Sequence, residues 1–84
     1  MAERPGTTHS VKCQPPYFVD VLSGRKTFEV RLDDRGYREG DTLHLMEWAD
    51  GKYTGFECDR LITYVLRDAE GFGLAPGYVV MELA

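Results

Sequence analysis

The stretch Gly24-Arg25-Lys26-Thr27-Phe28-Glu29-Val30-Arg31 marks the change from a helical pattern to a strand pattern, and it decides how the chain folds. Before this stretch, Phe18, Val21 and Leu22 recur at a spacing that places them on one face of a helix. We therefore predict a helix over residues 15–23. Gly24 would end it, because glycine readily adopts the left-handed conformation found after the last turn of a helix.

Within the stretch the apolar residues recur with a period of two, which is typical of a β-strand. Phe28 and Val30 would point to one face, and Thr27, Glu29 and Arg31 to the opposite face. We expect the apolar pair to enter the core and the polar side chains to form a row on the other side of the strand.

Alternation and turn residues predict further strands along the chain. Asp50-Gly51 predicts a tight hairpin, and the strand after it is long enough to bend, as strands do in small barrels. We predict an α+β fold: a small, mainly antiparallel β-barrel of about five strands with one early helix. The predicted strands are residues 9–13, 27–32, 42–48, about 54–66 and 77–83. The predicted core is Val11, Phe28, Val30, Leu43, Leu45, Ile62, Tyr64 and Val80.

The chain has 84 residues, which is the size of one small domain. We assign residues 1–8 to a loose N-terminal leader and residues 9–84 to a single domain. The sequence contains no apolar run long enough to cross a bilayer and no apolar segment typical of a secretory signal. We expect a cytoplasmic protein that does not bind membranes.

The net charge of −4 is distributed unevenly along the sequence. Residues 25–38 hold five basic and three acidic side chains, whereas residues 39–59 hold six acidic side chains and one lysine. An acidic protein binds the nucleic-acid backbone poorly, but a local basic patch can still hold one or two phosphates.

Two cysteines, Cys13 and Cys58, fall in strand-like segments, and we expect both to be buried, reduced thiols. The two histidines, His9 and His44, do not stand at the spacing of zinc ligands relative to either cysteine. We therefore expect no structural metal and no cofactor.

The pattern formed by Gly24, Lys26, Glu29 and Arg31 resembles the motif of ASCH domains, which belong to the PUA-like group of small β-barrels. The resemblance covers roughly residues 9–83, and over this range the chain looks like a family of short, uncharacterised ASCH-like proteins. It implies a PUA-like barrel whose motif side chains line a cleft between the helix and the barrel.

The resemblance leaves two classes of function open. The first is a binding module for RNA or for a modified nucleoside or base, with Lys26, Thr27, Glu29 and Arg31 in contact with the ligand. Arginine offers a planar pair of donors, and a carboxylate accepts hydrogen bonds from base amino groups. The oligomeric state stays open.

The second class is a small amidohydrolase acting on N-acylated nucleosides such as N4-acetylcytidine. One enzyme type among ASCH domains resembles this chain through Gly24 to Thr27, which implies Lys26 as its catalytic lysine. Its catalytic threonine would fall at Glu29, so the sequence departs from that pattern there. Its carboxylate comes from a later, longer segment that this sequence does not match, and Glu29 would have to substitute for that carboxylate. A lysine acts as a base or nucleophile when its pKa is lowered, and a neighbouring glutamate raises it. This favours the binding module.

Two further features could serve a ligand site. Aromatic rings near loops and strand ends could stack on bases, although most such rings belong to cores. These aromatic residues are Tyr17, Tyr37, Trp48, Tyr53, Phe72 and Tyr78. The glycine-rich segment 67–77 is either a connector or a lid over the cleft, with Phe72 at its tip.

Overall fold

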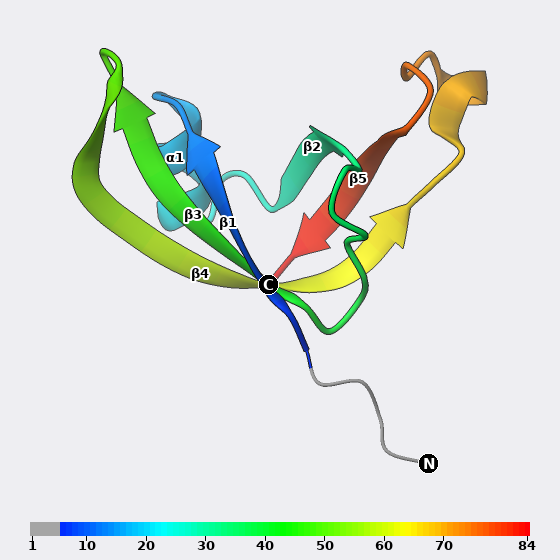
Figure 1. The fold of residues 1–84 in the computed structure, drawn as a ribbon, viewed down its shortest axis with the longest axis horizontal. Coiled ribbons are helices and arrows are strands. Elements are labelled where there is room, and N and C mark those ends of the chain that lie inside the picture. Colours follow the sequence, from blue (N-terminus) through cyan, green and yellow to red (C-terminus); the bar gives the residue numbers. More distant parts are fainter. Residues whose placement is uncertain (1–5) are drawn as a thin grey trace.

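The computed structural model describes residues 6–84, which form five strands, one helix and one short 3-10 turn. The first five residues of the predicted leader lie outside the described part, and β1 begins at Thr8. Along the chain the elements are β1 (Thr8–Cys13), α1 (Tyr17–Leu22), β2 (Phe28–Leu32), β3 (Thr42–Ala49), β4 (Lys52–Leu66), the 3-10 turn η1 (Ala69–Phe72) and β5 (Tyr78–Leu83), as drawn in Figure 1.

All five strands form one mixed sheet with the order β1-β3-β4-β5-β2. β1 runs parallel to β3, and the other neighbouring strands are antiparallel. The α+β class and the mainly antiparallel pairing are confirmed, but the prediction of a closed barrel is wrong. Among the described residues, no backbone pairing joins β1 to β2, so the sheet ends at these two strands instead of closing on itself.

The long strand β4 divides the sheet into two halves. Its first part pairs with β3 and its last part pairs with β5, and Figure 1 shows the two halves rising on either side of the bend. A bulge between Ile62 and Tyr64 lies near the change of partner. Bulges bend a strand and increase its twist, which explains how a 15-residue strand serves both halves.

The residues observed in the core differ from those predicted, because three strands turn the opposite face inward for at least part of their length. Phe28, Val30 and Tyr64 are 44–56% exposed, Val80 is half-buried, and Glu29 is buried. The buried cluster that replaces them includes Val11, Phe18, Val21, Tyr37, Leu43, Leu45, Ile62, Val65, Val79, Met81 and Leu83.

The face of β2 follows from its partner β5. Glu29 lies opposite Met81, and Arg31 lies opposite Val79, so these pairs share a face of the sheet. β5 turns Val79, Met81 and Leu83 inward, and β2 must therefore turn its polar residues inward as well. Pairing with β5, the more apolar strand, therefore decides which face of β2 is buried, although the alternation of β2 alone favours burial of Phe28 and Val30.

The extra residue of the β4 bulge explains the outward position of Tyr64. Ile62 pairs with Leu83, whereas Tyr64 pairs with Glu82, so the alternation of β4 shifts by one residue between them. Val65 is then buried in place of Tyr64. A one-residue shift moves every later side chain to the opposite face.

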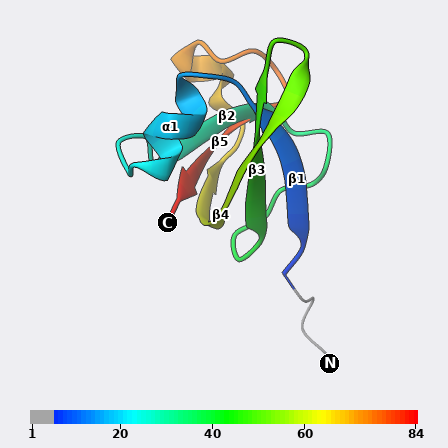
Figure 2. The same cartoon turned by 90° about the vertical axis from the view of Figure 1, so that its left-hand side faces the viewer.

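Helix α1 lies to one side of β1 and β3, as Figure 2 shows. Phe18 and Val21 are buried as predicted, but Leu22 is 51% exposed. Arg60 of β4 donates hydrogen bonds to the carbonyl oxygens of Val21 and Leu22, which stabilises the end of the helix. Gly24 has a φ of +82°, so its predicted left-handed conformation is confirmed.

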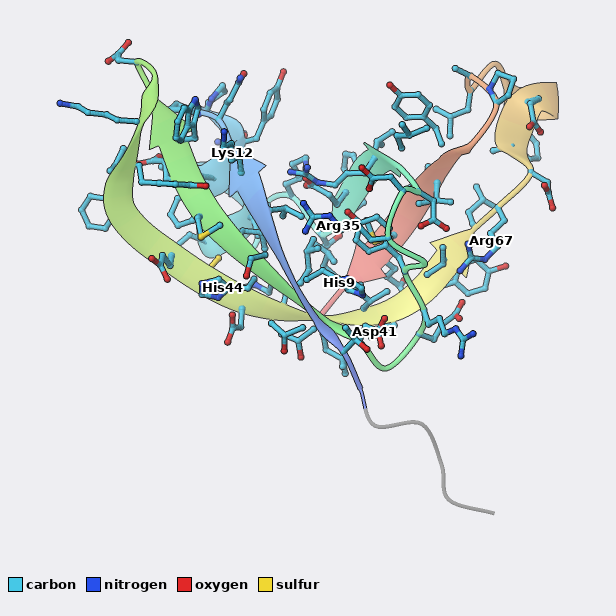
Figure 3. The ribbon with its side chains drawn as sticks, in the orientation of Figure 1. His9, Lys12, Arg35, Asp41, His44 and Arg67 are labelled. Carbon is cyan, nitrogen blue, oxygen red and sulfur yellow. The ribbon has the colours of Figure 1, made fainter. Side chains whose placement is uncertain are left out.

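A buried polar cluster fixes the start of β1 against the start of β3. The carboxylate of Asp41 accepts hydrogen bonds from His9 Nε2 at 2.8 Å, from the Thr7 amide at 3.0 Å and from the Arg38 amide at 3.2 Å. His9 also packs edge-on against the buried ring of Tyr37. Figure 3 shows His9 and Asp41 near the base of the two halves, where they hold β1 in register.

Candidate functional site

The side chain of Glu29 is the centre of the candidate site. It is 6% exposed, and each of its carboxylate oxygens accepts a hydrogen bond from a cation. Lys26 Nζ donates to Oε1 at 2.8 Å, and Arg31 Nε donates to Oε2 at 2.9 Å. Lys26 also donates to the carbonyl oxygen of Phe28 at 2.8 Å. The structure thus brings together three of the four residues predicted to bind a ligand.

Two arginines, Arg31 of β2 and Arg35 of the loop that follows it, reach across to β1. Arg31 donates from Nη2 to the carbonyl oxygen of Lys12, and Arg35 donates from Nη1 to the carbonyl oxygen of Ser10 at 2.5 Å. Figure 3 shows Arg35 between the two halves of the sheet. We call this line of contact, from Ser10 to Lys12 on β1 and from Arg31 to Arg35 on the other side, the seam. Side chains therefore join the two strands where a barrel would have backbone hydrogen bonds.

A pocket of about 440 Å³ opens between β1, α1 and β2, with Glu29 in its wall. Its volume falls in the range of small-molecule sites. The lining residues are Lys12, Cys13, Gln14, Tyr17, Lys26, Glu29, Val30, Arg31 and Trp48. Three cationic side chains stand against one carboxylate, so the pocket favours ligands that carry negative charge.

Lys12 and Trp48 line the pocket together, and we call this pair the rim of the pocket. The ammonium group of Lys12 lies 3.8 Å from the centre of the Trp48 ring, and Trp48 packs edge-on against Tyr53 at 4.8 Å. The two rings thus pack across the β3–β4 hairpin, and the indole also lines the pocket. The contribution of Lys12 and Gln14 was not predicted, because neither belongs to a motif. The parallel pairing of β1 with β3 places them there.

Cys13 lies in the pocket wall as a protonated thiol. Burial, followed by the nearby charge of Glu29, raises its pKa to about 11. A thiol is a poor nucleophile compared with a thiolate. The arrangement therefore does not favour Cys13 as an attacking group.

Thr27 does not join the other predicted residues. It lines a shallow groove on the opposite side of the sheet, together with Phe28 and Tyr64. The segment 67–77 contributes no residue to the pocket, and Phe72 is 84% exposed elsewhere on the molecule. Among the described residues, no contact between this segment and the pocket lining supports the hypothesis that it is a lid.

Residues 6–84 contain no group of three or more histidine, cysteine or acidic side chains arranged to hold a metal ion. No helix in the same part of the chain is long and apolar enough to span a membrane. Cys13 and Cys58 are free thiols.

Comparison with known proteins gives a family but no activity. A family model described as "Domain of unknown function (DUF3850)" matches residues 8–83. The chain is also 47% identical over 57 residues to a protein of Escherichia phage P2 described as an uncharacterized 12.9 kDa protein in the GpA 3' region. The aligned part covers 68% of this chain and 52% of that protein, so the chain spans about half the length of the curated relative that it matches.

Proposed function

We propose a function for this chain as a member of the DUF3850 family, to which it belongs through the match over residues 8–83. It is a binding module for a nucleobase, carried by a modified nucleoside or by RNA, and the base is held in the pocket around Glu29. The observation that carries this proposal is a buried carboxylate fixed by two cations in a pocket whose rim is an indole ring.

The chemistry of the pocket suits a nucleobase. A carboxylate has about four acceptor sites, and Lys26 and Arg31 use two of those on Glu29, so capacity remains for a base amino group. Tyr17 and Trp48 offer aromatic faces of the kind on which bases stack. The resemblance of Gly24, Lys26, Glu29 and Arg31 to the ASCH motif supports the same class of ligand.

The alternative of an amidohydrolase is less well supported. Lys26 donates hydrogen bonds to both Glu29 and the Phe28 carbonyl oxygen, so its amine is engaged by the protein and is not positioned to attack a substrate. Glu29 is likewise held in place, because Lys26 and Arg31 each donate a hydrogen bond to one of its carboxylate oxygens. Both groups are therefore arranged to position a ligand.

Calorimetric titration with the four ribonucleosides and N4-acetylcytidine tests the binding module. Glu29→Gln should weaken binding by about 1–3 kcal/mol, the usual share of a hydrogen bond to a charged group. Glu70→Gln, at an exposed site in η1, is the matched control and should have no effect. Thermal unfolding of both variants separates loss of binding from loss of fold.

The same mixtures, analysed by mass spectrometry, test the hydrolase. We expect N4-acetylcytidine to remain intact. Rapid release of cytidine that disappears in Lys26→Ala would overturn the binding module and establish the enzyme.

A further inference from the structure

The pocket around Glu29 continues into a second hollow along the seam. This second hollow has a volume of about 290 Å³ and is lined in part by Arg35, Tyr37 and Tyr78. Asp34 also lines it, and its carboxylate lies 3.8 Å from Nε of Arg35. Val30 and Arg31 line both hollows, so the two hollows adjoin at Arg31, and we call them together the groove. The second hollow lies outside the pocket that holds the base in the proposed function.

The wall of the groove formed by β1 is an unpaired strand edge. Among residues 6–84, β1 has β3 as its single strand neighbour, and the carbonyl oxygens of Ser10 and Lys12 point away from β3 to the arginines of the seam. The N–H and C=O groups of one residue point to the same side of a strand. The amide N–H groups of Ser10 and Lys12 therefore also face the seam, where β2 offers no backbone partner.

The opposite wall supplies guanidinium groups. Arg31 uses Nε and Nη2 for Glu29 and Lys12, and Arg35 uses Nη1 for Ser10. An arginine has five N–H donors, so each of the two keeps donors for a ligand. Amides on one side and guanidinium groups on the other favour an anionic ligand between them, and Ser10 and Lys12 lie about 7 Å apart along β1.

We propose that the groove binds a single-stranded oligonucleotide of two or more nucleotides across the seam. One base occupies the pocket around Glu29. The following phosphate accepts hydrogen bonds from Arg31, Arg35 and the β1 amides, and the next nucleotide lies against the partly exposed ring of Tyr78. This inference rests on the proposed function and deepens it, because it assigns the ligand to the polymer and not to the free nucleoside.

An extended peptide is the competing occupant of an unpaired strand edge. A peptide strand would need the β1 carbonyl oxygens as acceptors, and the arginines already donate to those of Ser10 and Lys12. A phosphate group needs only hydrogen-bond donors, so it can bind while the arginines keep their hydrogen bonds to Ser10 and Lys12. The chemistry of the seam therefore favours the oligonucleotide.

The chain contains one tryptophan, Trp48, and it lies at the rim of the pocket, so its fluorescence reports occupancy directly. The probes are the four ribonucleosides, their 5′-monophosphates and the four homotetranucleotides of RNA. We expect the best tetranucleotide to bind at least about tenfold more tightly than its nucleoside, since a charged hydrogen bond has about that effect.

The variant Arg35→Gln removes one of the two guanidinium groups of the seam, and Arg35 does not line the pocket around Glu29. It should lower the tetranucleotide affinity about tenfold and leave nucleoside affinity unchanged. Arg38→Gln removes the same charge from an exposed site outside the groove and should change neither affinity. Circular dichroism of both variants confirms that the fold is retained.

The outcomes separate the two proposals. Equal affinity for nucleoside and tetranucleotide, with no effect of Arg35→Gln, overturns the oligonucleotide groove and leaves the proposed function standing. Absence of binding to every probe overturns both. Binding of an unstructured tetrapeptide that Arg35→Gln strengthens, without binding of any tetranucleotide, assigns the seam to a peptide and overturns the inference.

Discussion

Cys13 shows how a single side chain in the pocket is controlled by its surroundings. Burial and the charge of Glu29 raise its pKa to about 11, so at pH 8 its thiolate fraction is on the order of a hundredfold below that of an ordinary cysteine with a pKa of about 8.5. We expect iodoacetamide to modify Cys13 far more slowly in the folded protein than in urea. Mass spectrometry of timed samples measures both rates. Equal rates in the two states would contradict the buried, protonated thiol.

His44 lies on the face of β3 opposite the buried Leu43 and Leu45, between two carboxylates. Its Nδ1 lies 2.5 Å from Asp59 and its Nε2 lies 2.8 Å from Glu57, and these hydrogen bonds, that with Asp59 first, raise its pKa above the usual value. A group whose pKa is raised by folding stabilises the protein fully below its unfolded-state pKa of about 6.5, and this contribution is lost as the pH rises through the folded-state pKa.

The variant His44→Gln should therefore lower the free energy of unfolding at pH 5.5 and leave it nearly unchanged at pH 9. Urea denaturation at the two pH values measures the difference, and the pH 9 measurement serves as the control. A loss of the same size at both pH values would show that His44 stabilises the strand by packing and not by its charge.

At the scale of residues, the sequence predicted part of the site. Lys26, Glu29 and Arg31 stand within six positions of one another, so a strand brings two of them to one face and the preceding loop adds the third. Lys12 and Trp48 are 36 positions apart, and they meet because β1 pairs in parallel with β3. No local pattern contains that pairing, so the sequence could not predict the rim of the pocket.

At the scale of elements, β2 and β5 show what period-two patterns can and cannot predict. The positions of the strands and of the Asp50-Gly51 hairpin follow from turn residues and alternation, and they are confirmed. The inward face of a strand depends on its partner, and β5 turns the polar side of β2 inward. The bulge after Ile62 adds a residue that no turn signal marks.

Because β5 buries Val79 while β2 exposes Val30, the same valine-to-threonine substitution should lower the free energy of unfolding more at Val79 than at Val30. Val79 is 3% exposed in β5, and Val30 is 44% exposed in β2. Val79→Thr should lower the free energy of unfolding by about 1–3 kcal/mol, because it buries a hydroxyl group. Val30→Thr should change it by less than about 0.5 kcal/mol, as is usual at exposed sites. Urea denaturation measures both values, and a larger loss for Val30→Thr would restore the predicted face of β2.

At the scale of the whole molecule, the charge limits how nucleic acid can bind. The net charge is −4, and the cations that line the groove are Lys12, Lys26, Arg31 and Arg35. A long single-stranded nucleic acid that extended beyond this groove would contact the rest of a protein whose net charge is negative. Binding beyond two or three phosphates is therefore unfavourable.

A long single-stranded RNA should bind weakly, and its affinity should fall with salt according to two or three phosphate contacts. The expected slope of log K against log salt concentration is about −1.5 to −2, from about −0.7 per phosphate on a single strand. Fluorescence anisotropy between low and physiological salt measures this slope. A slope steeper than about −5 would require a basic surface that the described residues do not provide.

The arginine bridges of the seam also determine how the backbone exchanges with solvent. Arginine side chains satisfy carbonyl oxygens but accept no hydrogen bond, so within residues 6–84 the seam offers no acceptor to the amide hydrogens of Ser10 and Lys12. The neighbouring amides of Val11 and Cys13 point to β3 and are protected by its ladder. Deuterium should therefore enter β1 at alternate residues, quickly at Ser10 and Lys12 and slowly at Val11 and Cys13. An occupant of the seam would slow the fast set and leave the slow set unchanged.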